Sequence, residues 1–138
     1  MRRLALLAVL ALAACGGSQT AEPEHVVRAW SDALNRGDDA AAAALFAPGA
    51  RIIQGDIELV LATAAQARRW NRGLPCSGTI VALETKGDVV TATFLLGDRP
   101  RHSCDAPGVK AETVLAVRDG KIVLWHEIAS EGVPTPIA

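Results

Sequence analysis

The sequence predicts an α+β domain, because helical periodicity dominates the first half of the chain and two-residue periodicity the second. Apolar residues recur at three-and-four spacing before residue 75, whereas beyond it they alternate with polar residues between tight turns. The chain has 138 residues, half of them hydrophobic, which is enough for one domain with a real core. We expect three N-terminal helices and a mostly antiparallel sheet.

Three segments carry helix signals. The first, residues 23–36, has Gly37 as its stop, and Asp38 is placed to cap the second, residues 39–46. Residues 63–66 have the spacing of a capping box and open the third helix, which runs to residue 72. One apolar stripe marks the first helix: Val26, Val27, Trp30, Ala33 and Leu34.

The other segments predict strands. Residues 50–54 and 57–61 form a short hairpin before the third helix, and four longer strands follow Pro75. Asp119-Gly120 is a strong signal for a tight hairpin between the last two strands. The long strands are expected at 78–85, 88–96, 110–118 and 121–129. We therefore place the domain at residues 23–130 and a flexible tail at residues 131–138.

The first fifteen residues predict export. Two arginines precede an unbroken apolar run over residues 4–14, which is too short to span a bilayer because spanning takes about 20 residues. Leu12-Ala13-Ala14 stands directly before Cys15, and the stretch resembles a bacterial lipobox. The resemblance implies removal of a signal peptide, residues 1–14, acylation of the Cys15 thiol, and lipid such as palmitate on the new amino terminus. A plain signal peptide that happens to contain a cysteine is the alternative.

These features predict where the protein is located. Residues 15–22 would be a lipidated tether, and the membrane would be a partner through the lipid, since several acyl chains anchor a protein stably. We expect an exported protein on the periplasmic or cell-surface side of a bacterial membrane.

The remaining cysteines predict a disulfide. With Cys15 assigned to lipid, Cys76 and Cys104 are an even pair in an oxidising compartment. In the predicted order Cys76 precedes the first long strand and Cys104 follows the second, so both belong at one edge of the sheet. A metal site and a reactive thiol are the alternatives, but no second cysteine or histidine cluster flanks either position, and with His102 the loop offers too few ligands for zinc. We predict no metal and no cofactor.

Charge and composition exclude two function classes. There are 14 basic and 15 acidic side chains, for a net charge of −1, and no basic patch with interleaved aromatic residues. A nucleic-acid partner is therefore not expected. Tyrosine is absent, which excludes a tyrosine-based active site.

Three motifs carry a family resemblance. They are a first helix ending in Gly37-Asp38, a Leu45-Phe46 junction between helix and strand, and the Asp119-Gly120-Lys121-Ile122 hairpin. Together with the element order, they resemble the nuclear transport factor 2-like fold in its SnoaL-like branch. The resemblance implies a curved sheet wrapped around the helices as a cone, with an apolar pocket at its open end. This fold hosts ketosteroid isomerase, polyketide cyclases, dehydratases and domains without chemistry, so fold alone does not select a function.

The residues that the isomerase needs are missing. Its acidic base would fall on or next to Gln54, which cannot ionise, and its tyrosine on Trp30, whose indole N–H can still donate. On the penultimate strand the acidic residue is Glu112, on the face opposite Thr113. We therefore predict no catalytic residue on this pattern.

His126 is the remaining candidate for chemistry. Strict alternation places it on the same face as Ile122 and Leu124, toward the cone, where an imidazole acts as base or ligand. A hydrogen-bonded core or rim histidine is the structural alternative. Glu127 is expected on the outer, solvated face. The predicted ligand pocket contains Trp30, Gln54, Thr113 and His126.

The favoured function is non-catalytic binding of a small apolar ligand or a partner by a lipid-anchored domain. One alternative is an isomerase, cyclase or hydratase that uses His126, and another is an interaction module of the cell envelope. Val114, Val123 and Trp125 are expected on the outer sheet face, where an exposed apolar patch suggests a homodimer.

Overall fold

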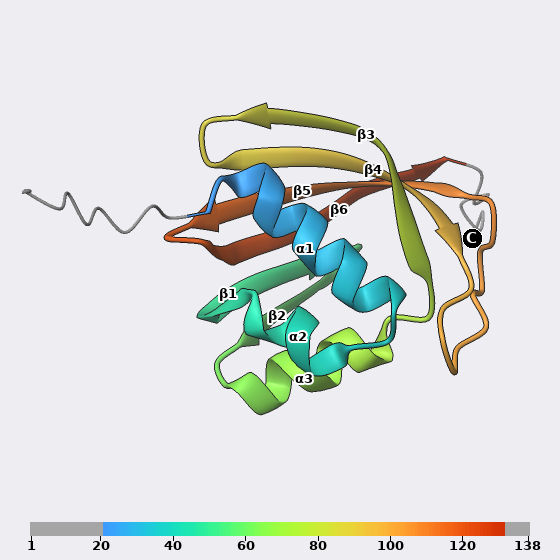
Figure 1. Cartoon of the computed structure of the whole chain (residues 1–138), viewed down its shortest axis with the longest axis horizontal. Helices are drawn as coiled ribbons and strands as arrows, with labels where there is room; N and C mark the ends of the chain where they lie inside the picture. The colour runs from blue at the N-terminus through green and yellow to red at the C-terminus, as the bar shows by residue number, and fades with distance from the viewer. Residues whose placement is uncertain (1–20, 132–138) are drawn as a thin grey trace, which may run out of the picture.

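A computed structural model describes residues 21–131 as one curved sheet of six strands with three helices (Figure 1). The helices are α1 (Pro23–Asn35), α2 (Asp39–Ala44) and α3 (Ala64–Gly73). The strands are β1 (Phe46–Gln54), β2 (Ile57–Leu61), β3 (Ser77–Lys86), β4 (Val89–Gly97), β5 (Lys110–Arg118) and β6 (Lys121–Glu131). The α+β prediction is confirmed. The predicted signal peptide and almost all of the tether and tail lie outside the described residues.

The sheet is mixed, with the strand order β2-β1-β6-β5-β4-β3. All neighbours are antiparallel except β1 and β6, which run parallel. Strand β1 begins at Phe46, so the second helix is two residues shorter than expected and Pro48 lies inside the strand. The proline is tolerated because the β1–β6 register shifts between Phe46 and Arg51, where no regular ladder hydrogen bond is required.

The helices cover the concave side of the sheet. Helix α1 lies across β3, β4, β5 and β6, whereas α2 and α3 pack together near β1 and β2 (Figure 1). Because the β1–β2 hairpin separates α3 from α1 and α2, the three helices do not form one N-terminal block. The predicted capping box is present: Thr63 Oγ1 accepts from Gln66 N at 3.2 Å, and Gln66 Oε1 accepts from Thr63 N at 3.1 Å. Within residues 21–131, none of the helices is both long and apolar enough to cross a membrane.

Aromatic rings meet in the centre of the core. Trp30 makes edge-to-face contacts with Phe46, Phe94 and Trp125 at ring-centre distances of 6.0–6.4 Å. Trp70 lies 5.0 Å from Trp125 and 5.5 Å from Phe46 in the same geometry. Such pairs contribute about 0.5–1.5 kcal/mol each beyond the area they bury. The cluster fixes the ring of Trp30 against the inner face of β6.

A β-bulge reverses the expected facing of β6. Val117 pairs with Ile122 but Ala116 pairs with Leu124, so Val123 is an extra residue in β6. After the extra residue of a bulge, each side chain of the strand lies on the opposite face from the one that strict alternation predicts. Trp125 therefore lies in the core opposite Leu115, and His126 lies on the outer face opposite Val114. The predictions that His126 faces the cone and that Trp125 faces outward are wrong for this reason.

Candidate functional site

A cavity of about 250 Å³ opens between α1, the start of β3 and the inner face of the sheet. Ser77 and the buried Gly78 of β3 line it, together with the exposed Asp105 of the loop after β4. The apolar wall is formed by Trp30, Leu74, Phe94, Leu96, Ala111 and Trp125. A concave, mostly apolar space with a few polar groups is the usual form of a small-molecule site.

The polar wall is one row of side chains across three strands. Gln54 of β1 and Thr113 of β5 are both register partners of Glu127 of β6, and all three line the cavity. Gln54 Nε2 donates a 2.9 Å hydrogen bond to Glu127 Oε2. Side chains opposite each other on neighbouring antiparallel strands have Cβ atoms about 5 Å apart, which places the Thr113 hydroxyl close to the carboxylate. The row therefore combines an amide, a carboxylate and a hydroxyl.

The two tryptophans of the wall differ in whether the indole N–H is hydrogen-bonded. Trp30 Nε1 donates to Asn71 Oδ1 at 2.8 Å, so Trp30 presents its ring to the cavity and not the donor expected from the sequence. Trp125 is only 5% exposed, and its Nε1 has no hydrogen-bond partner among the described residues. A buried donor without a partner costs roughly 1–3 kcal/mol. This N–H group is enclosed by the surrounding protein and is not open to the cavity.

Three of the four predicted pocket residues come together. Trp30, Gln54 and Thr113 line the cavity, whereas His126 does not. Glu127 takes its place, and sequence reasoning missed it because the bulge at Val123 is not visible in an alternating pattern. The tryptophan two residues before the acid was the available signal, since a large aromatic side chain favours the buried face and residues two apart in a strand share a face. The described residues lining the cavity include no histidine, lysine or arginine.

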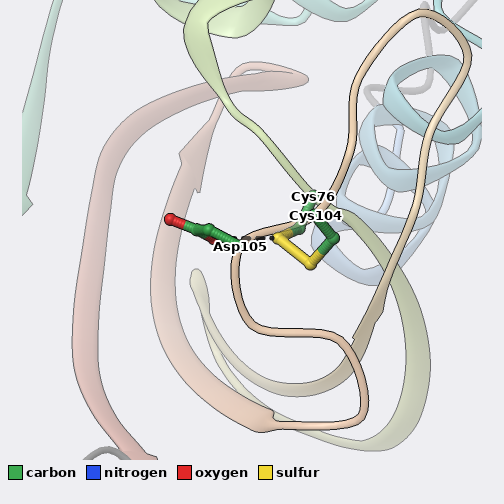
Figure 2. Close-up of side chains that lie close together, drawn as sticks. All are labelled: Cys76, Cys104 and Asp105. Atoms are coloured by element: carbon green, nitrogen blue, oxygen red, sulfur yellow. Dashed lines mark hydrogen bonds between the residues drawn. A yellow bond between two sulfur atoms is a disulfide. The ribbon is translucent and has the colours of Figure 1, made fainter.

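The predicted disulfide is present and borders the cavity. Cys76 and Cys104 are joined by a 2.08 Å S–S bond with their Cα atoms 4.4 Å apart, and Cys76 lines the cavity. Asp105 Oδ1 lies 3.4 Å from Cys76 Sγ (dashed in Figure 2). Because the sulfur of a disulfide carries no hydrogen, this approach is a contact and not a hydrogen bond. With both sulfurs in the bond, the Cys76–Cys104–Asp105 cluster offers a metal one carboxylate ligand.

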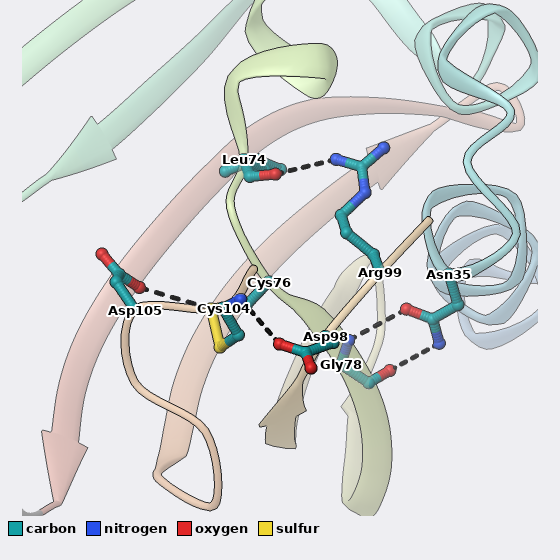
Figure 3. Close-up of a disulfide and its surroundings, with 8 residues drawn as sticks. All are labelled: Asn35, Leu74, Cys76, Gly78, Asp98, Arg99, Cys104 and Asp105. Atoms are coloured by element: carbon teal, nitrogen blue, oxygen red, sulfur yellow. Dashed lines mark hydrogen bonds between the residues drawn. A yellow bond between two sulfur atoms is a disulfide. The ribbon is translucent and has the colours of Figure 1, made fainter. Parts of the chain in front are cut away.

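A buried arginine attaches the loop after β4 to the helices. The Arg99 side chain is 1% exposed and donates to Asp39 Oδ1 at 2.6 Å. It also donates to the carbonyl oxygens of Asn71 at 2.9 Å and Leu74 at 2.8 Å, the latter drawn in Figure 3. In the same loop, Asp98 Oδ1 accepts from Cys104 N at 2.8 Å. These bonds fix the disulfide side of the cavity to α2 and the end of α3.

A second set of bonds joins α1 to the start of β3. Gly78 N donates to Asn35 Oδ1, and Asn35 Nδ2 donates to Gly78 O, both at 2.9 Å (Figure 3). Ser31 Oγ donates to the same carbonyl at 2.9 Å. A Cβ atom at Gly78 would lie 2.8 Å from Phe94 Cδ1, so glycine is required for this close approach. The cavity is therefore bordered by two hydrogen-bonded attachments and a disulfide.

Comparison with known proteins identifies the fold. A family model described as a SnoaL-like domain matches residues 27–125. No curated protein matches the sequence. An NTF2-like protein of unknown function from Cytophaga hutchinsonii superposes with a TM-score of 0.66 at 11% identity, covering 81% of this chain and 93% of its own.

Two further solved structures are similar at low identity. A hypothetical protein with a ketosteroid isomerase-like fold from Catenulispora acidiphila, in complex with trimethylamine, has a TM-score of 0.62 and 24% identity over 77% of this chain and 85% of its own. A candidate polyketide cyclase from Sinorhizobium meliloti has a TM-score of 0.62 and 18% identity over 75% of this chain and 94% of its own. At these identities the likeness concerns the fold alone.

Proposed function

Because the chain belongs to the SnoaL-like domain family, we propose that it is a lipid-anchored envelope protein whose cavity binds a small, largely apolar molecule without transforming it. The observation that carries the proposal is the cavity itself, with aromatic walls and a single polar row. Acid–base catalysis needs a positioned base and a group that stabilises the charge it creates. Glu127 is the ionisable side chain of the row, and Gln54 and Thr113 supply neutral polar groups beside it.

Anchoring is proposed from the lipobox. Cys15 and the first residue of α1, Pro23, are eight positions apart. Eight extended residues span at most about 28 Å, so a lipid on Cys15 would keep the cavity close to the membrane surface. The ligand would then be a molecule found at, or released from, that surface.

A cavity-filling substitution tests the binding proposal. Saturation-transfer NMR with a mixture of small aromatic and aliphatic compounds would be recorded on the full chain, on Ala111→Phe and on Ala116→Phe. Ala111 lines the cavity, whereas Ala116 lies on the opposite face of β5. We expect signals in the wild type and in Ala116→Phe, and their loss in Ala111→Phe with an unchanged circular dichroism spectrum. Equal signals in all three proteins would refute binding in this cavity.

Replacement of Cys15 tests the anchor. Cys15→Ser in a bacterial host should move the protein from the membrane fraction to the soluble exported fraction and remove the mass of the acyl chains. Unchanged fractionation and unchanged mass would contradict the lipoprotein proposal and leave the cavity proposal intact.

A homodimer through the outer sheet face is the second proposal. Val60, Val89 and Leu95 lie on this face, which the helices leave uncovered, and each is 39–56% exposed. Exposed apolar groups on one face often mark an interaction surface. Light scattering of the chain without its lipid, at high concentration, should give twice the monomer mass, and a monomer would exclude the dimer.

A further inference from the structure

The inner face of β2 carries aliphatic side chains that the helices leave uncovered. Ile57 is the register partner of Gln54, which lines the cavity, so Ile57 lies on the inner face of the sheet. Leu59 and Leu61 follow on the same face, because alternate residues of a strand share a face. Exposure rises from 4% at Leu61 to 44% at Leu59 and 60% at Ile57. Helix α3, which packs on β2, therefore covers Leu61 and leaves an open β2 strip of Leu59 and Ile57.

This strip is continuous with the cavity. Gln54 lines the cavity and is itself exposed, so the cavity opens to solvent at this side chain. Ile57 lies opposite Gln54 on the neighbouring antiparallel strand, where Cβ atoms are about 5 Å apart. The aliphatic surface thus begins where the cavity opens. A ligand longer than the cavity would leave it beside Gln54 and cover the strip.

A polar group inside the cavity is placed to hold one end of such a ligand. Thr113 is buried and lines the cavity, and its hydroxyl forms no hydrogen bond with another described residue. The enclosed side-chain polar atoms without a partner are, within residues 21–131, Arg99 Nε and Trp125 Nε1, so Thr113 Oγ1 stays open to the cavity. A threonine hydroxyl both donates and accepts hydrogen bonds, which suits a ligand hydroxyl group.

We infer that the cavity and the β2 strip together bind a long-chain aliphatic amphiphile that carries a hydroxyl group at its polar end. The polar end hydrogen-bonds to Thr113, and the chain passes Gln54 and lies on Ile57 and Leu59. The inference rests on the proposed binding function and names the chemical class of its ligand. Amphiphiles of this class collect at membrane surfaces, where the proposed anchor would keep the cavity.

A series of alcohols of increasing chain length tests the role of the strip. Titration of the full chain with 1-butanol, 1-hexanol and 1-octanol, followed by tryptophan fluorescence, gives the gain in affinity for each added methylene. Burial of a methylene on apolar surface is favourable, so we expect about a twofold gain for each, or about sixteenfold from butanol to octanol. In Ile57→Thr/Leu59→Thr the same step should give no more than about fourfold. Threonine keeps the strand preference, and circular dichroism verifies the fold.

Two further variants separate the strip from the polar anchor. Val81→Thr changes a comparably exposed aliphatic residue of β3 that does not line the cavity, and it should keep the sixteenfold gain. Thr113→Val preserves the shape of the side chain and removes the hydroxyl. It should weaken all three alcohols by the same factor, about fivefold, while the gain with chain length remains.

Each outcome separates this inference from the proposal on which it rests. An equal gain with chain length in the wild type and in Ile57→Thr/Leu59→Thr would overturn the inference and still show that the cavity binds small molecules. If that variant also converted a dimer to a monomer in light scattering, the strip would belong to a second copy of the chain. Failure of all three alcohols to bind the wild type would refute the ligand class, while the fragment experiment with Ala111→Phe decides separately whether the cavity binds anything.

Discussion

Trp30 and Asn71 are joined by a 2.8 Å hydrogen bond across the core, from the indole Nε1 to the amide Oδ1. Asn71 is fully buried, and its Nδ2 donates in turn to the carbonyl oxygen of Ala67 at 2.9 Å. The pair connects α1 to α3 and fixes the ring that forms one wall of the cavity. Removing the amide would leave a donor buried without a partner.

Asn71→Ala should therefore lower the free energy of unfolding by about 1–3 kcal/mol, because it leaves Trp30 Nε1 unsatisfied. Asn71→Ala combined with Trp30→Phe removes donor and acceptor together, so the double variant should lose less than the sum of the single losses. Urea denaturation of the wild type, Asn71→Ala, Trp30→Phe and the double variant measures this coupling. Additive losses would show that the bond contributes nothing to stability.

The buried ion pair between Arg99 and Asp39 should be the most sensitive polar contact of the fold. Arg99→Met removes the 2.6 Å partner of the buried Asp39 carboxylate and leaves it the exposed Arg72, whose Nε lies 3.5 Å from Asp39 Oδ2, for an expected loss of about 3 kcal/mol, the lower end for a broken buried pair. Arg99→Met/Asp39→Leu should recover part of that loss, since no unpaired charge remains.

Arg36 provides the control for this prediction. Its 3.9 Å pair with Asp38 is exposed on both sides, so Arg36→Met should cost less than about 1 kcal/mol. Thermal or urea unfolding compares the three variants. If Arg99→Met costs no more than Arg36→Met, the buried pair has no special role in holding the loop.

The disulfide should stabilise the fold through the loop it closes. Cys76 and Cys104 are 28 positions apart, and for a loop of that length the chain-entropy estimate is about 3.6 kcal/mol. Cys76→Ala/Cys104→Ala should lower the free energy of unfolding by about that amount in urea denaturation. It should also weaken binding in the cavity, because Cys76 and Asp105 form part of its border. Unchanged stability and unchanged binding would refute both expectations.

Local patterns made the elements predictable. Residues 110–118 alternate between exposed and buried positions as their sequence alternates, and the capping box at Thr63 begins α3 as expected. The disulfide followed from counting cysteines and from the order of two strands. Each of these signals is contained within one segment or follows from adjacent segments, so sequence alone was sufficient.

Long-range relationships were not predictable in this way. Gln54 and Glu127 are 73 positions apart, and their contact depends on the parallel pairing of β1 with β6, which no local pattern encodes. Arg99 and Asp39 are 60 positions apart, and each in isolation has the sequence signature of a surface charge. The bulge at Val123 changed the facing of β6 and exchanged His126 for Glu127 in the site.

The presence of Glu127 in the cavity, in place of His126, gives a direct prediction. His126 is half-buried on the outer face between Val114 and Ile53, so His126→Ala should change the affinity for a fragment that binds the wild type by no more than about twofold, the effect of an ordinary surface substitution. Glu127→Ala removes the charged acceptor of the polar row and should weaken a fragment that hydrogen-bonds to this row about tenfold or more. Titration by tryptophan fluorescence, with circular dichroism to verify the fold, compares the two. If His126→Ala abolished binding while Glu127→Ala retained it, the inner face of β6 would be the one that strict alternation predicts, and the bulge at Val123 would have to be abandoned.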